Sequence, residues 1–590
     1  MFKIPVILLF FLFLYSCSPA TQQPFSLSVK TYLIAQFDTL QNNTEKDLLR
    51  LATTGSADSI KLSFHNCRNA YKQLEWFTEY YAPTASRELN GPPLPEIEIE
   101  ETKVFPPSGF QVMEEYLYPQ WKEENRSELL REIRSFQSTL KRTRVILEET
   151  EFTEAHVIDA CKQEVFRIII LGISGFDTPL SQTGIPEASV SLKAVKQILS
   201  FVGDNKTLAK LFAQADKYLN QHRDFNSFDR MAFITGFANP LTMEMMAWQK
   251  ELKIKPLPTS LALNTQASTL FNANAFNTNY FSGNLEAHAT PAKVALGKTL
   301  FFAPVVSGGS RSCASCHKPE LAFTDGLPRS AALTAGKFVQ RNAPTLLYAG
   351  LQNAQFYDMR SPTLENQAMD VMANKDELHT PVETLATQLN QKPETVQAFK
   401  KAFPTMESEI KPRYVMMAIA SYIRSLAPFN SRFDKYMRGD NTQLQAQEIK
   451  GFNLFMGKAK CGTCHFMPLF NGTAGPAFTN TEAEVLGVPE NPKAKNLRID
   501  PDQGRYFHNP IDELRYSFKT PTLRNIAQTA PYMHNGSYKT LAEVINFYNE
   551  GGGRGLNINI DNQTLPPDKL NLSKQEQEII IAFLNALTDN

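Results

Sequence analysis

Two copies of the pattern C-x-x-C-H constrain this chain more than any other feature. They are Cys313-Ala-Ser-Cys316-His317 and Cys461-Gly-Thr-Cys464-His465. Two thiols one helical turn apart can add to the two vinyl groups of one porphyrin, and the adjacent histidine then reaches the iron. Structural zinc is the alternative, but it takes four ligands from neighbouring Cys/His pairs, whereas each cluster here stands alone. The spacing therefore predicts two covalently bound c-type haems.

The first residues have the pattern of an export signal. Met1-Phe2-Lys3 precedes an apolar run, 4–14, that is too short for an ordinary membrane-spanning helix. Cys17 follows this run and is similar to the cysteine of a bacterial lipobox. We expect residues 1–16 to be a lipoprotein signal peptide and Cys17 to carry lipid on the periplasmic side of a bacterial membrane, with the outer membrane as the expected one. A plain signal peptide with an incidental cysteine is the alternative.

Composition is that of an ordinary globular protein with several domains. The 590 residues are 42% hydrophobic and 20% charged, and the net charge is zero, so no nucleic-acid partner is expected. Of the seven cysteines, Cys67 and Cys161 remain after the lipid and haem assignments. An exported protein allows these two to form a disulfide, but the sequence leaves that pairing open.

Hydrophobic periodicity predicts an all-α fold, with an N-terminal helical domain followed by two cytochrome c-like haem domains. Apolar residues recur at three- and four-residue spacing in 127–151, 152–171 and 415–426. Capping boxes begin helices after Thr540 and Ser573. The expected boundaries are 17–262 for the N-terminal domain, 263–290 for a polar connector, 291–440 for the first haem domain and 441–590 for the second.

From residue 290 onward the sequence resembles the bacterial di-haem cytochrome c peroxidases, and especially their MauG-like branch. The resemblance covers half of the chain. It rests on both haem motifs and on Leu296-Gly297, Phe323-Thr-Asp-Gly326, Arg341-Asn-Ala-Pro-Thr-Leu-Leu347, Thr363-Leu-Glu-Asn-Gln-Ala368, Pro521-Thr-Leu-Arg-Asn525, Thr529-Ala-Pro-Tyr-Met-His534 and Phe547-Tyr-Asn-Glu-Gly-Gly552. It implies a peroxidatic first haem and an electron-transferring second haem.

The resemblance implies an open iron face at the first haem. Many family peroxidases close that face with a histidine from the loop before the R-N-A-P-T motif, but residues 326–340 contain no histidine. His379 lies beyond the family's position, and we expect it at the pocket rim or on the surface. The family's glutamate and glutamine for peroxide cleavage correspond to Glu377 and Gln367, with Glu365 as the alternative glutamate. Tyr357 replaces the tryptophan that the family usually places between the haems.

At the second haem the resemblance implies His465 as one ligand and Tyr548 as the other. Met533 is the competing ligand. The alternative for Tyr548 is that it packs in the core without binding iron. His534 is expected to contact a ligand or a haem propionate. The resemblance also implies a calcium ion between the haem domains, held by the Asn342 side chain and the backbone carbonyls of Thr529 and Pro531.

One motif of the N-terminal domain has a separate resemblance. Gly109-Phe-Gln111-Val-Met-Glu114 is similar to the G-x-H-x-x-E motif of imelysin-like helical domains of exported bacterial proteins, with Gln111 in place of the histidine. A core helix after a chance glycine is the alternative, and the sequence gives this domain no chemistry.

Together these features predict an exported, lipid-anchored peroxidase that reduces hydrogen peroxide. Its electrons would come from a small donor protein (a cytochrome c or a cupredoxin), or it would oxidise a protein or organic substrate at long range. A di-haem electron carrier without turnover is one alternative, and a lipoprotein that binds iron or another ligand, with accessory haems, is a second.

Overall fold

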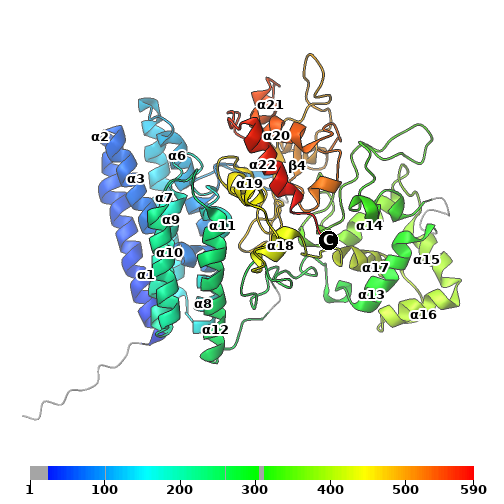
Figure 1. The fold of residues 1–590 in the computed structure, drawn as a ribbon, viewed down its shortest axis with the longest axis horizontal. Coiled ribbons are helices and arrows are strands. Elements are labelled where there is room, and N and C mark those ends of the chain that lie inside the picture. The colour runs from blue at the N-terminus through cyan, green and yellow to red at the C-terminus, as the bar shows by residue number, and fades with distance from the viewer. Residues whose placement is uncertain (1–23, 100, 259–260, 305–310) are drawn as a thin grey trace, which may run out of the picture.

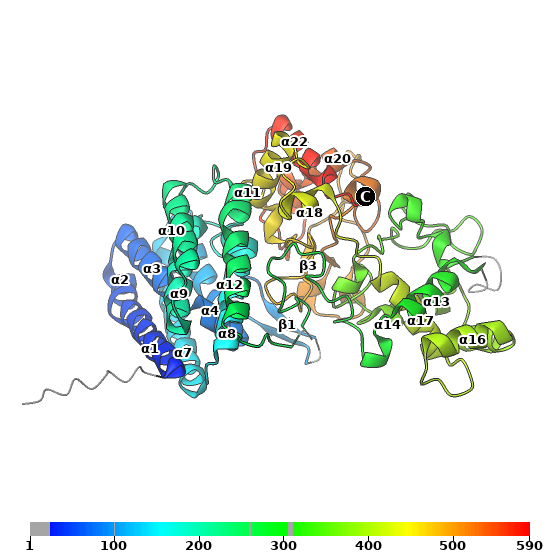
Figure 2. The same ribbon diagram turned by 60° about the horizontal axis from the view of Figure 1, so that its bottom comes forward.

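The computed structural model describes residues 24–99, 101–258, 261–304 and 311–590. The expected signal peptide and Cys17 lie outside these residues. Helices predominate, and within the described residues no helix is both long enough and apolar enough to cross a membrane. Figure 1 shows three bodies: the N-terminal helices, the body with the first haem motif and the C-terminal body with the second. The C-terminal body lies between the other two and is called the central body below, so the order in space differs from the order in sequence. The view in Figure 2 keeps this order.

The N-terminal body is a bundle of long helices. Helix α1 (Phe25–Asn42) buries Val29, Leu33, Phe37 and Leu40, which form one apolar stripe facing the bundle. The bundle also contains α2 (Leu49–Thr54), α3 (Ala57–Lys72), α4 (Glu75–Tyr81), α5 (Pro83–Asn90), α6 (Phe110–Leu117), α7 (Arg126–Glu149), α8 (Glu154–Arg167), α9 (Gly184–Val202), α10 (Lys206–Gln221), α11 (Arg230–Phe233) and α12 (Asn239–Glu251). The helices predicted over 127–151 and 152–171 correspond to α7 and α8, with a π turn, Ile168–Gly172, after α8.

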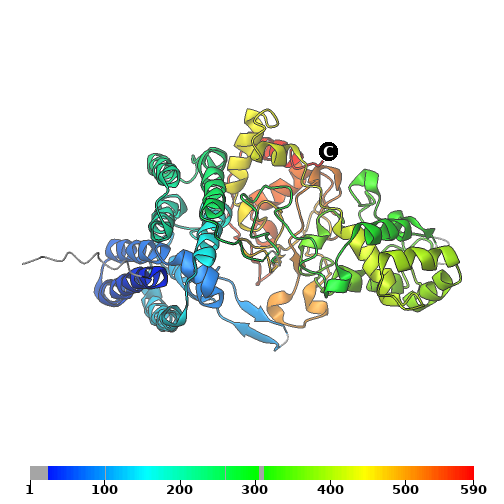
Figure 3. The ribbon, with the colours of Figure 1, turned by 90° about the horizontal axis from the view of Figure 1, so that it is seen from below.

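A β-hairpin between α5 and α6 departs from the all-α expectation. Strands β1 (Glu96–Glu98) and β2 (Lys103–Phe105) pair antiparallel, with Glu96 opposite Phe105. Pro92, Pro93 and Pro95 precede β1 and cannot continue a helix, so the chain stays extended there. The hairpin leaves the bundle and runs along the central body, as seen from below in Figure 3.

In each of the two bodies that carry a haem motif, two helices cross closely at a glycine. In the first, α13 (Pro291–Phe302) crosses α17 (Pro412–Arg424) at Gly297, where an added Cβ would lie 1.8 Å from the Ala418 carbonyl oxygen. In the second, α19 (Ala446–Met456) crosses α22 (Lys574–Asn585) at Gly451, where a Cβ would lie 2.2 Å from the Ile579 carbonyl oxygen. In each body a glycine therefore lets the helix before the haem motif approach the body's last helix at backbone distance.

The remaining elements frame the haem motifs. The first body adds α14 (Leu364–Ala373), α15 (Val382–Asn390) and α16 (Pro393–Ala402), and the second adds α18 (Arg432–Met437), α20 (Leu541–Asn549), α21 (Gly552–Gly555), β3 (Ala483–Val485) and β4 (Ser517–Lys519). The predicted capping boxes at Thr540 and Ser573 are confirmed at the starts of α20 and α22. Helix α17 corresponds to the predicted helix over 415–426.

The cysteines of the N-terminal bundle are both free. Cys67 and Cys161 are fully buried, and Thr44 donates a hydrogen bond to the Cys67 sulfur at 3.8 Å. The disulfide that the sequence left open is not formed.

Candidate haem sites

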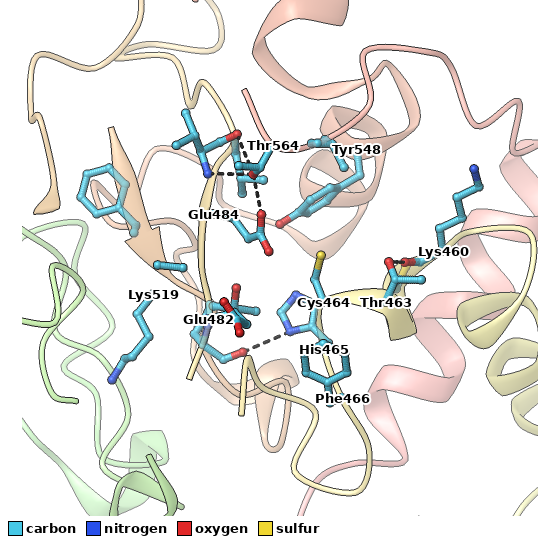
Figure 4. A pocket seen from close by; sticks show the side chains of 18 of the residues that line it. Lys460, Thr463, Cys464, His465, Phe466, Glu482, Glu484, Lys519, Tyr548 and Thr564 are labelled. Carbon is cyan, nitrogen blue, oxygen red and sulfur yellow. Dashed lines mark hydrogen bonds between the residues drawn. The ribbon is translucent and has the colours of Figure 1, made fainter. Parts of the chain in front are cut away.

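The second motif lies on the wall of a large cavity. Cys461, Cys464 and His465 line a space of about 1400 Å³ that continues past Tyr357 and Gln367 of the first body. The strand pair β3–β4, with Ala483 opposite Lys519, forms another wall. Figure 4 shows Tyr548 and Glu484 directed towards the space beside Cys464 and His465.

Both motif histidines have the hydrogen bonds expected of an iron ligand. Nδ1 of His317 lies 2.9 Å from the Phe323 carbonyl oxygen, and Nδ1 of His465 lies 3.2 Å from the Phe470 carbonyl and 3.1 Å from that of Pro521. Because a carbonyl can only accept, Nδ1 carries the proton and Nε2 is left to bind metal. Burial lowers the pKa of His465 to about 4, which keeps the ring neutral.

Cationic groups beside the second motif suit the carboxylates of a porphyrin. Lys519 Nζ donates to the Ala354 carbonyl at 3.0 Å, and burial lowers the pKa of this amine to about 7. The Nε of Arg505 is buried without a hydrogen-bond partner among the described residues. Both residues line the cavity, so propionate groups would find partners there. The residues present therefore fit a haem at this motif.

Tyr548 and Met533 both face this cavity, so the structure brings the two candidate ligands to one site. Tyr548 lies near the end of α20, and burial raises the pKa of its phenol. Glu484 accepts a hydrogen bond from Thr564, and burial raises the pKa of its carboxyl to about 7. The choice between Tyr548 and Met533 stays a prediction.

The two candidate glutamates of the first site have different surroundings. Glu365 forms a two-point ion pair with Arg424, at 2.6 and 2.7 Å. Glu377 accepts a hydrogen bond from Asn374 Nδ2 at 2.8 Å, and burial raises the pKa of its carboxyl while Arg360 opposes that shift. The Glu377 carboxyl is also the smallest of several influences on the pKa of the Cys316 thiol, which burial raises.

The other residues predicted for the first site are placed as follows. Gln367, on α14, is half-buried and lines the cavity. His379 is exposed, with φ of 46°, two residues after Glu377. The 326–340 loop is held to the turn before Glu377 because Leu333 donates its backbone N–H to the Asp376 carbonyl at 2.9 Å. The catalytic roles of Gln367 and Glu377 stay predictions.

Tyr357 and Asn342 lie where the two haem bodies meet. The Tyr357 hydroxyl donates to Asn342 Oδ1 at 3.4 Å, and Lys519 donates its backbone N–H to the Tyr357 carbonyl at 2.7 Å. The Asn342 backbone N–H donates to the His534 carbonyl at 2.8 Å, and the His534 ring stacks on Phe518 with centroids 3.8 Å apart. Tyr357 therefore contacts the second haem body, and its role between the haems stays a prediction.

The residues predicted to hold calcium lie at the same junction. Asn342, Thr529 and Pro531 all line the cavity. The ring of His534 faces Asp500, with Nε2 3.4 Å from Oδ1. These positions bring the predicted oxygen ligands to one region, and the calcium ion itself stays a prediction.

Comparisons with known proteins agree with this geometry. Residues 291–442 match the family described as di-haem cytochrome c peroxidase. The chain is 33% identical over 299 residues to the methylamine utilization protein MauG of Methylorubrum extorquens, a match that covers 50% of this chain and 78% of that protein. It is 31% identical over 334 residues to cytochrome c551 peroxidase of Pseudomonas aeruginosa, covering 56% and 88%.

The chain belongs to the di-haem cytochrome c peroxidase family. Like the family's members, it carries two c-type haems and is an oxidoreductase that uses peroxide. Among solved structures it is similar to a MauG-like protein associated with microbial copper homeostasis, at 28% identity, with a TM-score of 0.45 and coverage of 52% of this chain and 92% of that one.

Sequence reasoning missed several polar residues of this di-haem peroxidase. Glu484, Lys519, Arg505 and Thr564 line the cavity of the second motif from separate segments. Each is a charged or hydroxyl residue outside any motif, and the pairing of β3 with β4 that brings two of them together spans more than thirty residues of loop. No local sequence pattern carries that pairing.

Proposed function

We propose that this chain is an exported, lipid-anchored di-haem peroxidase that reduces hydrogen peroxide at the first haem site and draws electrons through the second. The two motif-bearing bodies would be cytochrome c-like domains, and the imelysin-like N-terminal domain and Cys17 would complete a periplasmic lipoprotein. The single observation that supports this most is the position of Glu377, which Asn374 holds in a turn that contacts the histidine-free loop 326–340.

The haem held by Cys313, Cys316 and His317 supplies the redox chemistry that cleaves the O–O bond. Glu377 takes a proton from the oxygen nearer the haem and returns it to the leaving oxygen, which departs as water. Its raised pKa suits this exchange, because a carboxyl that titrates closer to neutral pH can both accept and donate. Gln367 holds the oxygens by hydrogen bonds, and Asn374 holds the Glu377 carboxyl in place.

The bridge between the sites would be Tyr357, which contacts both haem bodies. At the second site His465 and Tyr548 would hold the haem iron, and an anionic phenolate oxygen would favour its oxidised state. A calcium ion on Asn342, Thr529 and Pro531 would fix the geometry between the bodies. The reductant would be a small donor protein or an oxidisable protein or organic substrate.

Low-temperature EPR of the fully oxidised protein tests the proposal. A high-spin ferric signal beside a low-spin one, both lost after one equivalent of hydrogen peroxide, is the expected result. Two low-spin signals that do not respond to peroxide would mean that the first site is closed, and the protein would then be an electron relay.

A further inference from the structure

The N-terminal domain contacts the second haem motif at both of its ends. Lys460, which precedes Cys461, donates from Nζ to the Pro179 carbonyl at 3.2 Å. Phe466, which follows His465, packs edge-on against Phe176 with ring centroids 5.7 Å apart. The segment that attaches the porphyrin is therefore held against the N-terminal domain rather than exposed on the surface of the central body.

This contact is closely fitted. Asn453 donates to Asp229 at 2.9 Å and accepts from the Met231 backbone N–H at 3.1 Å. Gly457 of the central body lies against the Arg230 guanidinium, where an added Cβ would come within 2.8 Å of a nitrogen. At Gly475 an added Cβ would likewise lie 2.5 Å from the Ile170 side chain. Two glycines thus leave room for N-terminal side chains, and one hydrophobic core runs through both bodies.

The N-terminal domain also forms one wall of the cavity at this motif. Its contribution includes Asn90, Gln111, Arg167, Phe176, Leu180 and Phe225. The Pro92–Pro95 segment continues this wall, and its fixed backbone resists rearrangement. The cavity of about 1400 Å³ is the space in which the porphyrin of this motif would lie, and it is too small for a folded protein to enter.

The MauG relative is too short to contain a counterpart of the whole N-terminal domain. The match covers 78% of the MauG relative, and the unmatched remainder is too short for a domain of this size. We propose that the N-terminal domain closes the thioether edge of the second haem site to folded donor proteins, so that the reductants are small diffusible organic molecules such as quinols. This rests on the proposed function, because it assumes that electrons enter through the second site. Electron transfer slows steeply with distance, so a donor protein kept outside this wall would react slowly.

The test uses the full-length holoprotein after one equivalent of peroxide. The return of the low-spin EPR signal and of the absorption spectrum is followed with hydroquinone or with a reduced monohaem cytochrome c at equal concentration. We expect the signals to return at least a hundredfold faster with hydroquinone than with the cytochrome. The rate with the cytochrome should show no saturation as its concentration rises. Saturable reduction by the cytochrome, at a rate within tenfold of that with hydroquinone, would overturn the inference. A protein that never responds to peroxide would instead refute the proposed function.

A variant pair gives a second measurement. The double variant Asp229→Ala/Asn453→Ala removes contacts at this interface, and Leu62→Ala, at an exposed position of the N-terminal domain, is the control. Hydrogen exchange across residues 453–466 shows whether the interface has loosened. In a loosened protein we expect the cytochrome rate to rise at least tenfold while the hydroquinone rate stays within twofold. A loosened interface without that rise would overturn the inference.

Discussion

Glu365 and Glu377 show how surroundings decide the role of a side chain. The family motif contains Glu365, but its carboxylate is paired with the buried Arg424. Glu377 has no cation at hydrogen-bond distance and accepts only from Asn374 among the described residues. Sequence register favoured Glu377 as the acid–base group, whereas the pairing of Glu365 with Arg424 joins two helices and could not be read from the sequence.

Substituting each glutamate by glutamine separates these roles. Glu377→Gln is expected to slow the reaction with peroxide by about 10²–10⁴-fold, because the proton carrier is lost, with little change in melting temperature. Glu365→Gln leaves Arg424 without its charged partner, so the free energy of unfolding should fall by about 3–5 kcal/mol. Stopped-flow absorption and thermal melts measure the two effects. If Glu365→Gln reacted slowly with peroxide but stayed stable, while Glu377→Gln reacted at the normal rate, Glu365 would be the acid–base group instead.

Glu164 predicts a pH dependence of stability. It is 2% exposed, neither oxygen has a hydrogen-bond partner among the described residues, and burial with the nearby Glu75 raises its pKa well above the ordinary value. Below the ordinary pKa of about 4.3 the carboxyl is protonated whether folded or not. Above it, folding must take up a proton, so this group lowers stability increasingly as pH rises towards the folded pKa.

Glu164→Gln should therefore stabilise the protein by about 1–3 kcal/mol at pH 8 and have little effect at pH 4. Thermal melts between these pH values measure the difference. The exposed Glu149 provides the control, since Glu149→Gln should leave the profile unchanged. Equal destabilisation of Glu164→Gln at both pH values would show that its carboxyl is ionised and paired in the folded protein.

At the scale of elements, local signals were sufficient for helices and insufficient for strands. The Thr540 and Ser573 capping boxes predicted where α20 and α22 begin, because capping depends on four consecutive residues. The β3–β4 pair joins residues far apart in the chain, so its partners are chosen by tertiary packing. The haem motifs could be identified from the sequence, but the residues that line the cavity around them could not.

The helix crossings at Gly297 and Gly451 make a prediction for these elements. Gly297→Ala or Gly451→Ala forces a Cβ into a carbonyl of the facing helix, and either should lower the free energy of unfolding by about 1–3 kcal/mol or more. Gly236→Ala is the control, because no atom of the described residues lies within 4 Å of the added Cβ. Chemical denaturation of the holoproteins measures the effect. Equal stability of all three variants would show that the helices can move apart without cost.

At the scale of the whole molecule, the order of the bodies in space could not be predicted from the order of the domains. The C-terminal body lies between the other two because it supplies apolar surface to the N-terminal bundle, and one hydrophobic core spans both. The first haem body has its own core, from Ala287 to Ile423, and adds Tyr348 and Leu351 to the core of the other two bodies. Its links to the central body include polar contacts such as Arg341 with Asp502, at 2.6 Å. No sequence pattern identifies which apolar faces of separate domains will meet.

This division of cores predicts two calorimetric transitions in the holoprotein. The N-terminal and central bodies should unfold together, because separating them would expose a shared core, and the first haem body should unfold separately. Gly297→Ala should then lower only the transition of the first haem body. Asn453→Ala, which removes two hydrogen bonds worth about 1 kcal/mol each, should lower only the other. If both variants shifted the same transition, the whole chain would be a single cooperative unit, and the polar contacts between the haem bodies would couple them as strongly as a shared core does.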